Sequence, residues 1–338
     1  MKIKHDRIRF SWIELKNGET IAFRQKGQGD TAIILVHGNT GSSKHWRLLM
    51  EQLPEHYAVY APDLRGFGDS TYTEPIQSIE DFSKDLFLFA EAMELKSFIL
   101  AGWSLGGAVC MQFAAEHPKM VKKLILMASA GVRGFPVSKR GLFKRPINGQ
   151  YLTDHESLYK ELKPMVKAMR QRTDWIIRTA LDFSLFNVQR PSREHQDELV
   201  RVVFQQRNLV DVNYALAYFN ISHESNGVVD GNGMVDNITA PTLVLQGDRD
   251  MVVNQEIAET TVNSIGENAR LVILGGCGHY PLLDDIDAVS KEYLSFIENH
   301  EGERLRRIKI NVKNAPILEK LGKVLVRLNP LRPHVDIP

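Results

Sequence analysis

Several features that mark other classes of protein are scarce in this sequence of 338 residues. Its two cysteines, Cys110 and Cys277, are too few for a disulfide framework, and we expect both to be small buried side chains rather than reactive thiols. The amino-terminal residues lack the apolar segment of a secretory signal, and no apolar run is long enough to span a membrane. These absences predict a cytoplasmic protein.

An excess of charge is also missing. The formal net charge of +1 at pH 7 gives no reason to expect a nucleic-acid partner. The charge is unevenly distributed, however, because residues 302–338 hold nine Lys or Arg against three Asp or Glu. We expect this segment to be a basic carboxyl-terminal extension beyond the last helix of the main fold.

The extension contains two apolar patterns. Ile308, Ile310 and Val312 alternate with polar residues, as in a short strand, and apolar residues from Ile317 to Leu328 recur at helical spacing. Two roles stay open for this helix. It would pack on the body or on a second subunit as a homo-oligomer contact, or it would touch an anionic surface or a hydrophobic granule.

The most informative stretch is residues 98–107, Phe-Ile-Leu-Ala-Gly-Trp-Ser-Leu-Gly-Gly. A short apolar strand leads into Gly102-Trp103-Ser104-Leu105-Gly106, and a helix-forming run follows, which is the context of a nucleophilic serine. A serine at so sharp a turn has strained backbone angles, so the residues two positions away must be nearly free of side chain. We predict that Ser104 is a nucleophile.

A nucleophilic serine needs a base and a carboxylate. Where the serine stands in a turn from a strand into a helix, the carboxylate and then the histidine follow it along the chain. A strand over 271–275 leads into a glycine-rich loop that carries His279, and a strand over 242–247 ends at two aspartates, Asp248 and Asp250. We predict that His279 is the base. Asp250 is the preferred acid because it directly precedes three apolar residues and suits a buried position. Asp248 stays the alternative and would otherwise cap the turn.

An oxyanion hole requires backbone N–H groups close to the serine. The apolar run 31–36 is followed by His37-Gly38-Asn39-Thr40-Gly41, where glycine lets the backbone approach a substrate. We predict that the N–H groups of Asn39 and Leu105 form the oxyanion hole. His37 is expected to brace the loop.

Near-continuous apolar strands alternate with helical stretches along the chain, as is typical of a parallel sheet covered on both faces. We predict an α/β protein with a mostly parallel, doubly wound sheet, formed by residues 1–131 and 241–301. Residues 10–26 would add a hairpin with its turn at Asn17-Gly18. Further strands are predicted at 31–36, 57–61, 97–101, 123–128, 242–247 and 271–275.

The segment 132–240 lacks strand signals and is too long for a plain connection, so we predict a helical cap domain over the strand ends. Trp175 and Phe183, with Trp103 beside the serine, would line a substrate pocket. Alternatively, Trp175 and Phe183 only hold the cap helices together, and Trp103 only fills the core beneath the serine turn. Helical patterns cover 156–170, 173–184, 192–205 and 210–220.

Five motifs in this order resemble the α/β-hydrolase family of the Ser-His-Asp type. They are His37-Gly-Asn-Thr-Gly, Asp63-Leu-Arg-Gly-Phe-Gly-Asp-Ser70, Gly102-Trp-Ser-Leu-Gly-Gly, Gly247-Asp-Arg-Asp250 and Gly278-His279. The serine sets this chain apart from members whose nucleophile is aspartate. More narrowly, residues 37–46 and 63–72 are similar to intracellular polyhydroxybutyrate depolymerases.

These residues predict a serine hydrolase that cleaves carboxylic esters through an acyl-enzyme, without a metal or a cofactor. The substrate is expected to be a small-molecule or polymeric ester, and the narrower resemblance implies 3-hydroxyalkanoate esters. Two alternatives stay open. The same triad supports C–C bond hydrolysis, acyl transfer or cofactor-free perhydrolysis, and a hydrolase scaffold can also serve as a binding protein without activity.

Overall fold

The protein is described by a computed structural model that covers residues 8–140, 145–298 and 308–311. Nine strands form one sheet in the order β1-β2-β4-β3-β5-β6-β9-β10-β11. β2 runs antiparallel to both β1 and β4, and the other neighbours are parallel. The strands are Arg9–Glu14 (β1), Thr20–Lys26 (β2), Thr31–Val36 (β3), Tyr57–Pro62 (β4), Phe98–Trp103 (β5), Val121–Met127 (β6), Thr242–Gly247 (β9), Ala269–Leu274 (β10) and Ile308–Asn311 (β11).

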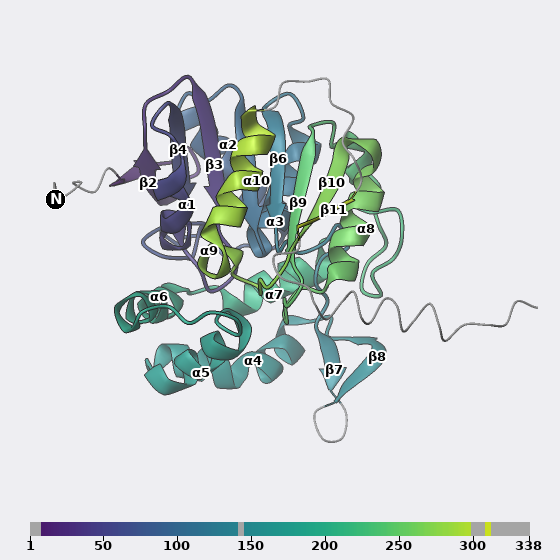
Figure 1. The fold of residues 1–338 in the computed structure, drawn as a ribbon. Helices are drawn as coiled ribbons and strands as arrows, with labels where there is room; N and C mark the ends of the chain where they lie inside the picture. The colour runs from purple at the N-terminus through teal and green to yellow at the C-terminus, as the bar shows by residue number, and fades with distance from the viewer. Residues whose placement is uncertain (1–7, 141–144, 299–307, 312–338) are drawn as a thin grey trace, which may run out of the picture.

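Helices cover both faces of the sheet (Figure 1). One face packs against α1, α9 and α10, and the other packs against α2, α3 and α8. The predicted α/β fold with a mostly parallel sheet is therefore confirmed. These helices are Arg47–Gln52 (α1), Ile79–Ala92 (α2), Leu105–Glu116 (α3), Gln255–Ile265 (α8), Pro281–Asp284 (α9) and Ile286–Glu298 (α10).

Side chains along the central strands alternate between the two faces. In β3, Ile33 and Leu35 belong to the cluster with α1 and α10, whereas Ile34 and Val36 belong to the cluster with α2 and α3. All four are fully buried, because successive residues of a strand point to opposite faces and both faces are covered. Burial on both faces explains why the sequence of these strands is apolar without a break.

The segment 132–240, called the insertion below, joins β6 to β9. Its four helices lie close to the predicted positions, and Figure 1 shows them as a layer beside one end of the sheet. The structure also contains an antiparallel pair, β7 and β8, that the sequence analysis missed. The elements are Ser138–Arg140 (β7), Pro146–Tyr151 (β8), His155–Arg170 (α4), Asp174–Ser184 (α5), Arg193–Gln205 (α6) and Leu209–Tyr218 (α7).

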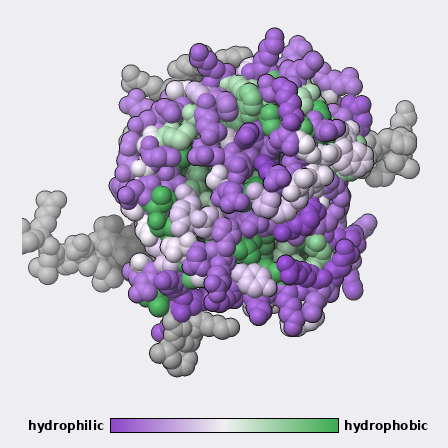
Figure 2. Space-filling view, turned by 180° about the vertical axis from the view of Figure 1, so that it is seen from behind, coloured by the Kyte–Doolittle hydropathy of each residue, from purple (hydrophilic) through white to green (hydrophobic). Residues whose placement is uncertain are grey.

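Most buried apolar side chains in the described part of the insertion belong to the two clusters that cover the sheet. Ile177 and Leu199 from its helices share a buried cluster with Trp103, and Val212 and Phe219 join the cluster on the other face of the sheet. These side chains of the insertion therefore pack against the same clusters as the strands and helices of the sheet. The surface seen from behind is mostly hydrophilic, with apolar residues in several small groups (Figure 2).

Two expectations concern the carboxyl-terminal extension. Residues 308–311 form β11, which pairs in parallel with β10, so this part of the extension adds a strand to the sheet beyond the predicted boundary at 301. The predicted amphipathic helix over 317–328 lies outside the described residues. Within residues 8–140 and 145–298, no helix is both long enough and apolar enough to cross a membrane.

Candidate active site

The order of the strands brings the predicted site residues to one edge of the sheet. β3, β5, β9 and β10 are parallel members of that sheet, and each is followed closely by one site segment. The carboxyl ends of parallel strands lie at the same edge, where open α/β sheets bind ligands. The residues concerned are Asn39 after β3, Ser104 after β5, Asp250 after β9 and His279 after β10.

Ser104 occupies the turn between β5 and α3 with φ 55° and ψ −119°, a conformation that costs a non-glycine residue on the order of 1–3 kcal/mol. The surrounding backbone leaves no space for larger neighbours. A Cβ on Gly102 would lie 2.3 Å from the carbonyl oxygen of Gly106, and a Cβ on Gly106 would lie 2.1 Å from that of Val36. This crowding is the physical reason for the glycines on either side of the serine.

Ser104, His279 and Asp250 form a continuous hydrogen-bonded chain. The Oγ of Ser104 lies 3.1 Å from Nε2 of His279, and Nδ1 of His279 lies 2.8 Å from Oδ2 of Asp250. An ionised carboxylate can only accept, so Nδ1 carries the proton in this pair. Nε2 of the neutral ring is then free to accept the proton of the Ser104 hydroxyl, which is the arrangement that a general base requires.

The environment of Asp250 keeps its carboxylate ionised. Burial raises the pKa of Asp250. The hydrogen bond and charge of His279, together with the N–H groups of Val252 and Val253, lower it by more than burial raises it, so the pKa of Asp250 is below its usual value. Oδ1 accepts both of those N–H groups, at 2.8 and 2.9 Å. Asp248, the alternative acid, is exposed and accepts the N–H of Gly276 at 2.7 Å instead.

The two predicted oxyanion-hole donors come from different segments, the N–H of Asn39 from the loop after β3 and the N–H of Leu105 from the start of α3. Among hydrogen bonds between described residues, neither the N–H of Asn39 nor that of Leu105 has an acceptor. Leu105 is the first residue of α3, where helical N–H groups lack partners within the helix. A Cβ on Gly38 would lie 2.9 Å from Cβ of Ser104, so glycine lets this loop pass next to the serine.

His37 braces that loop, as expected. The N–H of Leu64 donates to Nε2 of His37 at 3.0 Å, which leaves Nδ1 as the donor to the carbonyl oxygen of Gly38 at 2.8 Å. Burial lowers the pKa of His37, which keeps the ring neutral and preserves this pattern.

Trp103 lies behind the site and not in an open pocket. Its side chain is 1% exposed, and its indole N–H donates to the carbonyl oxygen of His279 at 2.8 Å. The ring of His45 stacks on it with 5.2 Å between centroids, and Tyr280 lies at 5.2 Å as well. Of the two roles expected for Trp103, this buried position fits a side chain that fills the core beneath the serine turn.

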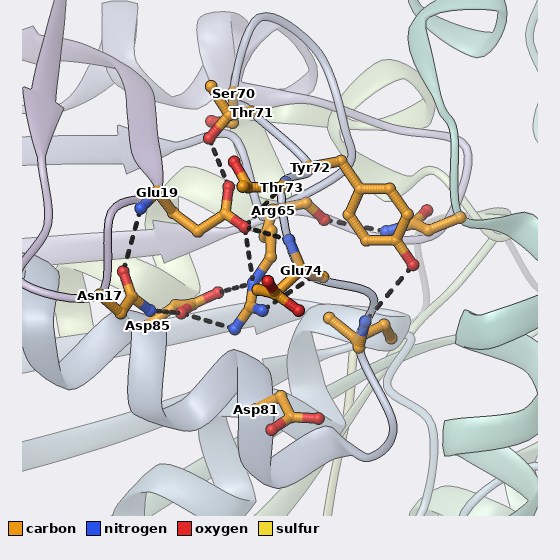
Figure 3. A network of polar contacts seen from close by, with 12 residues as sticks. Asn17, Glu19, Arg65, Ser70, Thr71, Tyr72, Thr73, Glu74, Asp81 and Asp85 are labelled. Atoms are coloured by element: carbon orange, nitrogen blue, oxygen red, sulfur yellow. Dashed lines mark hydrogen bonds and ion pairs between the residues drawn. The ribbon is translucent and has the colours of Figure 1, made fainter.

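The loop after β4 carries the motif from Asp63 to Ser70 and is held by buried charges (Figure 3). Arg65 pairs with Asp85 of α2 through two hydrogen bonds, at 2.7 and 2.8 Å. Glu19, 1% exposed, accepts the N–H groups of Thr73 and Glu74 at 2.9 Å. This network fixes a loop that borders both the β3 loop and the insertion.

Two contributions from outside the predicted set escaped the sequence analysis. Asp284 accepts the N–H of Gly278 at 2.7 Å and that of Gln189 at 3.0 Å, so it joins the histidine loop to the insertion. Gln206 of the insertion bonds to the β3 loop at Thr40 and Asn39. Neither residue stands in a recognisable motif, and the contacts that join them to the insertion or the β3 loop span 95 residues or more, so no local signal could have identified them.

Trp175 and Phe183 are not where the sequence analysis expected them. They are 69% and 66% exposed, whereas Ile177 and Leu181 of the same helix are buried. With 100° between successive residues, the two aromatic side chains project from the side of α5 opposite its buried face. This placement contradicts the prediction that they line a pocket above Ser104.

Cys110 and Cys277 are buried and unpaired, and burial raises the pKa of Cys277 to about 12. Their expected character as inert buried side chains agrees with this environment. Within the described ranges, no three His, Cys, Asp or Glu side chains are grouped as they would be around a metal ion.

Comparison with known proteins agrees with this architecture. The sequence model of the alpha/beta hydrolase fold family matches residues 31–286. The chain belongs to the α/β-hydrolase fold family. The matched region contains the β5–α3 turn with Ser104, Asp250 after β9 and His279 after β10.

Among curated proteins, this α/β-hydrolase is 25% identical to Lipase 1 of Psychrobacter immobilis over 303 residues, which cover 86% of this chain and 85% of the lipase. It is 28% identical to the 2-hydroxy-6-oxo-2,4-heptadienoate hydrolase of Pseudomonas putida, over 73% of this chain and 82% of that enzyme. Among solved structures, an esterase from Thermogutta terrifontis matches with a TM-score of 0.66 and 21% identity, covering 86% of this chain and 98% of the esterase, which shows a common fold.

Proposed function

We propose that this protein is a serine hydrolase that cleaves carboxylic esters through a covalent acyl-enzyme. The observation that carries the proposal is the hydrogen-bonded chain from Ser104 Oγ through both ring nitrogens of His279 to Asp250. The lipase relative, which is similar over most of both chains, supports ester hydrolysis as the reaction.

In this mechanism, Ser104 Oγ attacks the ester carbonyl carbon while its proton moves to Nε2 of His279. The carbonyl oxygen becomes negatively charged and accepts hydrogen bonds from the N–H groups of Asn39 and Leu105, an interaction that contributes about 3–4 kcal/mol per donor in a serine protease. His279 then protonates the leaving alkoxide, and the acyl group remains on Ser104. Water, deprotonated by His279, releases the carboxylic acid and restores the serine.

The finer proposal concerns the substrate. The similarity of residues 37–46 and 63–72 to polyhydroxybutyrate depolymerases supports 3-hydroxyalkanoate esters or their polymer as the substrate class. A second candidate function is C–C bond hydrolysis, favoured by the similarity to the hydrolase of 2-hydroxy-6-oxo-2,4-heptadienoate. Both reactions would use the same Ser104, His279 and Asp250.

One set of assays separates these possibilities. Rates are measured on p-nitrophenyl esters of increasing chain length, on amorphous polyhydroxybutyrate and on 2-hydroxy-6-oxo-2,4-heptadienoate, for the natural protein and for Ser104→Ala. We expect ester turnover that Ser104→Ala abolishes, and labelling of Ser104 by a fluorophosphonate. Ester turnover by Ser104→Ala at the natural rate would overturn the mechanism. Turnover of the dienoate in the absence of any ester turnover would favour the second candidate.

A further inference from the structure

The junction between α6 and α7, residues 205–208, lies along the loop that follows β4. Gln205 donates to Oδ1 of Asp69 at 2.8 Å, the N–H of Arg207 donates to the Gly66 carbonyl at 2.9 Å, and Asn208 donates to the Arg65 carbonyl at 2.8 Å. These bonds connect the insertion to a loop that the buried Arg65–Asp85 pair already holds in place.

Gln206 points to a different loop. Its Oε1 accepts the N–H of Thr40 at 3.1 Å, and its Nε2 donates to Oδ1 of Asn39 at 2.8 Å and to Oδ1 of Asn208 at 3.0 Å. The residue is 6% exposed, so both ends of its carboxamide are engaged in a largely buried position. Among the described residues of the junction, Gln206 alone hydrogen-bonds to the loop after β3.

The loop that Gln206 holds is strained. Thr40 has φ 56°, in the left-handed region that a β-branched residue rarely adopts. Such a conformation persists only where the surrounding structure fixes it. His37 fixes the Gly38 carbonyl on one side of Asn39. On the other side, the Thr40 N–H is shared between Oδ1 of Asn39 and Oε1 of Gln206, and Gln206 Nε2 donates to that same Oδ1.

We propose that Gln206 is a positioning residue for the oxyanion hole, an insertion side chain that sets the direction of the Asn39 N–H beside Ser104. This inference rests on the proposed function, since it assumes that the Asn39 N–H binds the oxyanion. Through Gln206, the insertion would influence the rate of the chemical step as well as the choice of substrate. Loss of Gln206 would let the strained Asn39–Thr40 backbone relax and turn the donor away from the oxyanion.

The chain supplies a matched control. Gln205 is the same residue type, adjacent in sequence, and its carboxamide also bonds the insertion to the body, but at Asp69 and not at the β3 loop. If Gln206 merely holds the insertion in place, Gln205→Ala and Gln206→Ala should have similar effects. If Gln206 positions the oxyanion donor, their kinetic effects should differ.

The test measures kcat and KM on p-nitrophenyl acetate and p-nitrophenyl butyrate, together with the inhibition constant of a trifluoromethyl ketone, which forms an oxyanion on the serine. We expect Gln206→Ala to lower kcat by about 10- to 100-fold with KM within about twofold, by one common factor on both esters. The inhibitor should lose affinity by a similar factor. Gln205→Ala should stay within about twofold of the natural protein in all three quantities.

Gln206→Met repeats the test with a side chain of similar length that fills the space without hydrogen bonds, in case the alanine variant does not fold. Equal kinetics for the Gln205 and Gln206 variants, or a Gln206 effect confined to KM, would overturn the inference while the loss of activity in Ser104→Ala upholds the proposed function. Activity of Ser104→Ala at the natural rate would instead overturn the proposed function itself.

Discussion

The indole N–H of Trp103 donates a hydrogen bond to the main-chain carbonyl oxygen of His279, at 2.8 Å. The residue directly before the serine thus holds the backbone of the histidine that faces the serine. Both side chains are buried, at 1% and 3% exposure, so water does not readily replace this bond. The contact links the β5–α3 turn to the loop after β10, two segments that the sequence places 176 residues apart.

Replacing Trp103 by phenylalanine should therefore reduce catalysis. Trp103→Phe keeps an aromatic ring next to His45 but removes the donor, which leaves the His279 carbonyl unpaired and its ring less well positioned over Ser104. We expect kcat on p-nitrophenyl butyrate to fall by about tenfold, with KM little changed. Steady-state kinetics measures both.

Trp46→Phe is the matched control. Trp46 is also fully buried, but among the described residues its indole nitrogen has no hydrogen-bond partner. The same loss of volume should lower the free energy of unfolding in both variants. If Trp46→Phe reduces kcat as much as Trp103→Phe, the hydrogen bond to His279 has no catalytic consequence and packing alone accounts for the effect.

The two candidate acids should differ widely. Asp250→Asn replaces the acceptor of the His279 Nδ1 proton and favours the wrong tautomer of the ring, a change that costs about 10⁴-fold in kcat in a serine protease. Asp248→Asn keeps an oxygen acceptor for the Gly276 N–H and should leave kcat within about threefold. Ester hydrolysis by the two variants at saturating substrate checks the ranking. A larger loss in Asp248→Asn would reassign the role of the acid.

Much of this arrangement could be predicted from local patterns. The strand positions follow from apolar runs that are buried on both faces. The β5–α3 turn follows from Gly102 and Gly106, where any larger residue would collide with neighbouring backbone atoms. Parallel strands then carry Ser104, Asp250 and His279 to one edge of the sheet, because each residue follows the carboxyl end of its strand.

The contributions of the insertion could not be predicted in this way. Gln206 bonds to Thr40 across 166 residues, and no periodicity encodes a single polar contact of that kind. The orientation of α5 was also undetermined, because Trp175 and Phe183 are as apolar as the residues that the helix buries. β7 and β8 are short, mostly exposed and polar, so they lack the apolar runs by which the other strands were recognised.

The corrected position of α5 changes the expected determinants of chain length. Phe183 is exposed, whereas Phe186 is 2% exposed, shares a cluster with Trp103 and precedes Asn187, which bonds to the Asp250 loop at the Arg249 carbonyl. We expect Phe183→Ala to leave the ratio of kcat/KM for octanoate and acetate esters unchanged within about twofold. Phe186→Leu should shift that ratio by about fourfold, the value of one buried methylene group. A shift caused by Phe183→Ala would restore the original prediction.

His45 should make folding sensitive to mild acid. Burial, then the positive charge of neighbouring His37 when protonated, lowers the pKa of His45 from 6.5 to about 3. The ring is 1% exposed and stacks on Trp103, so the folded state keeps it neutral. Between these two pKa values the unfolded chain binds a proton that the folded chain does not. The contribution of the neutral His45 ring to the free energy of unfolding is therefore complete above pH 6.5 and is lost as the pH falls toward 3.

The contribution of His45 can be isolated from the slope of the unfolding free energy against pH. One proton corresponds to about 1.4 kcal/mol of unfolding free energy per pH unit, and His45→Phe removes that proton while it keeps an aromatic ring against Trp103. Urea unfolding at pH 6, 5 and 4 should therefore give a steeper loss of stability for the natural protein than for His45→Phe, by about this amount per unit. The lost hydrogen bond from Ser42 to Nδ1 lowers the variant's stability at every pH and leaves the slope unaffected. Equal slopes for the two proteins would mean that His45 accepts a proton in the folded state as readily as in the unfolded chain.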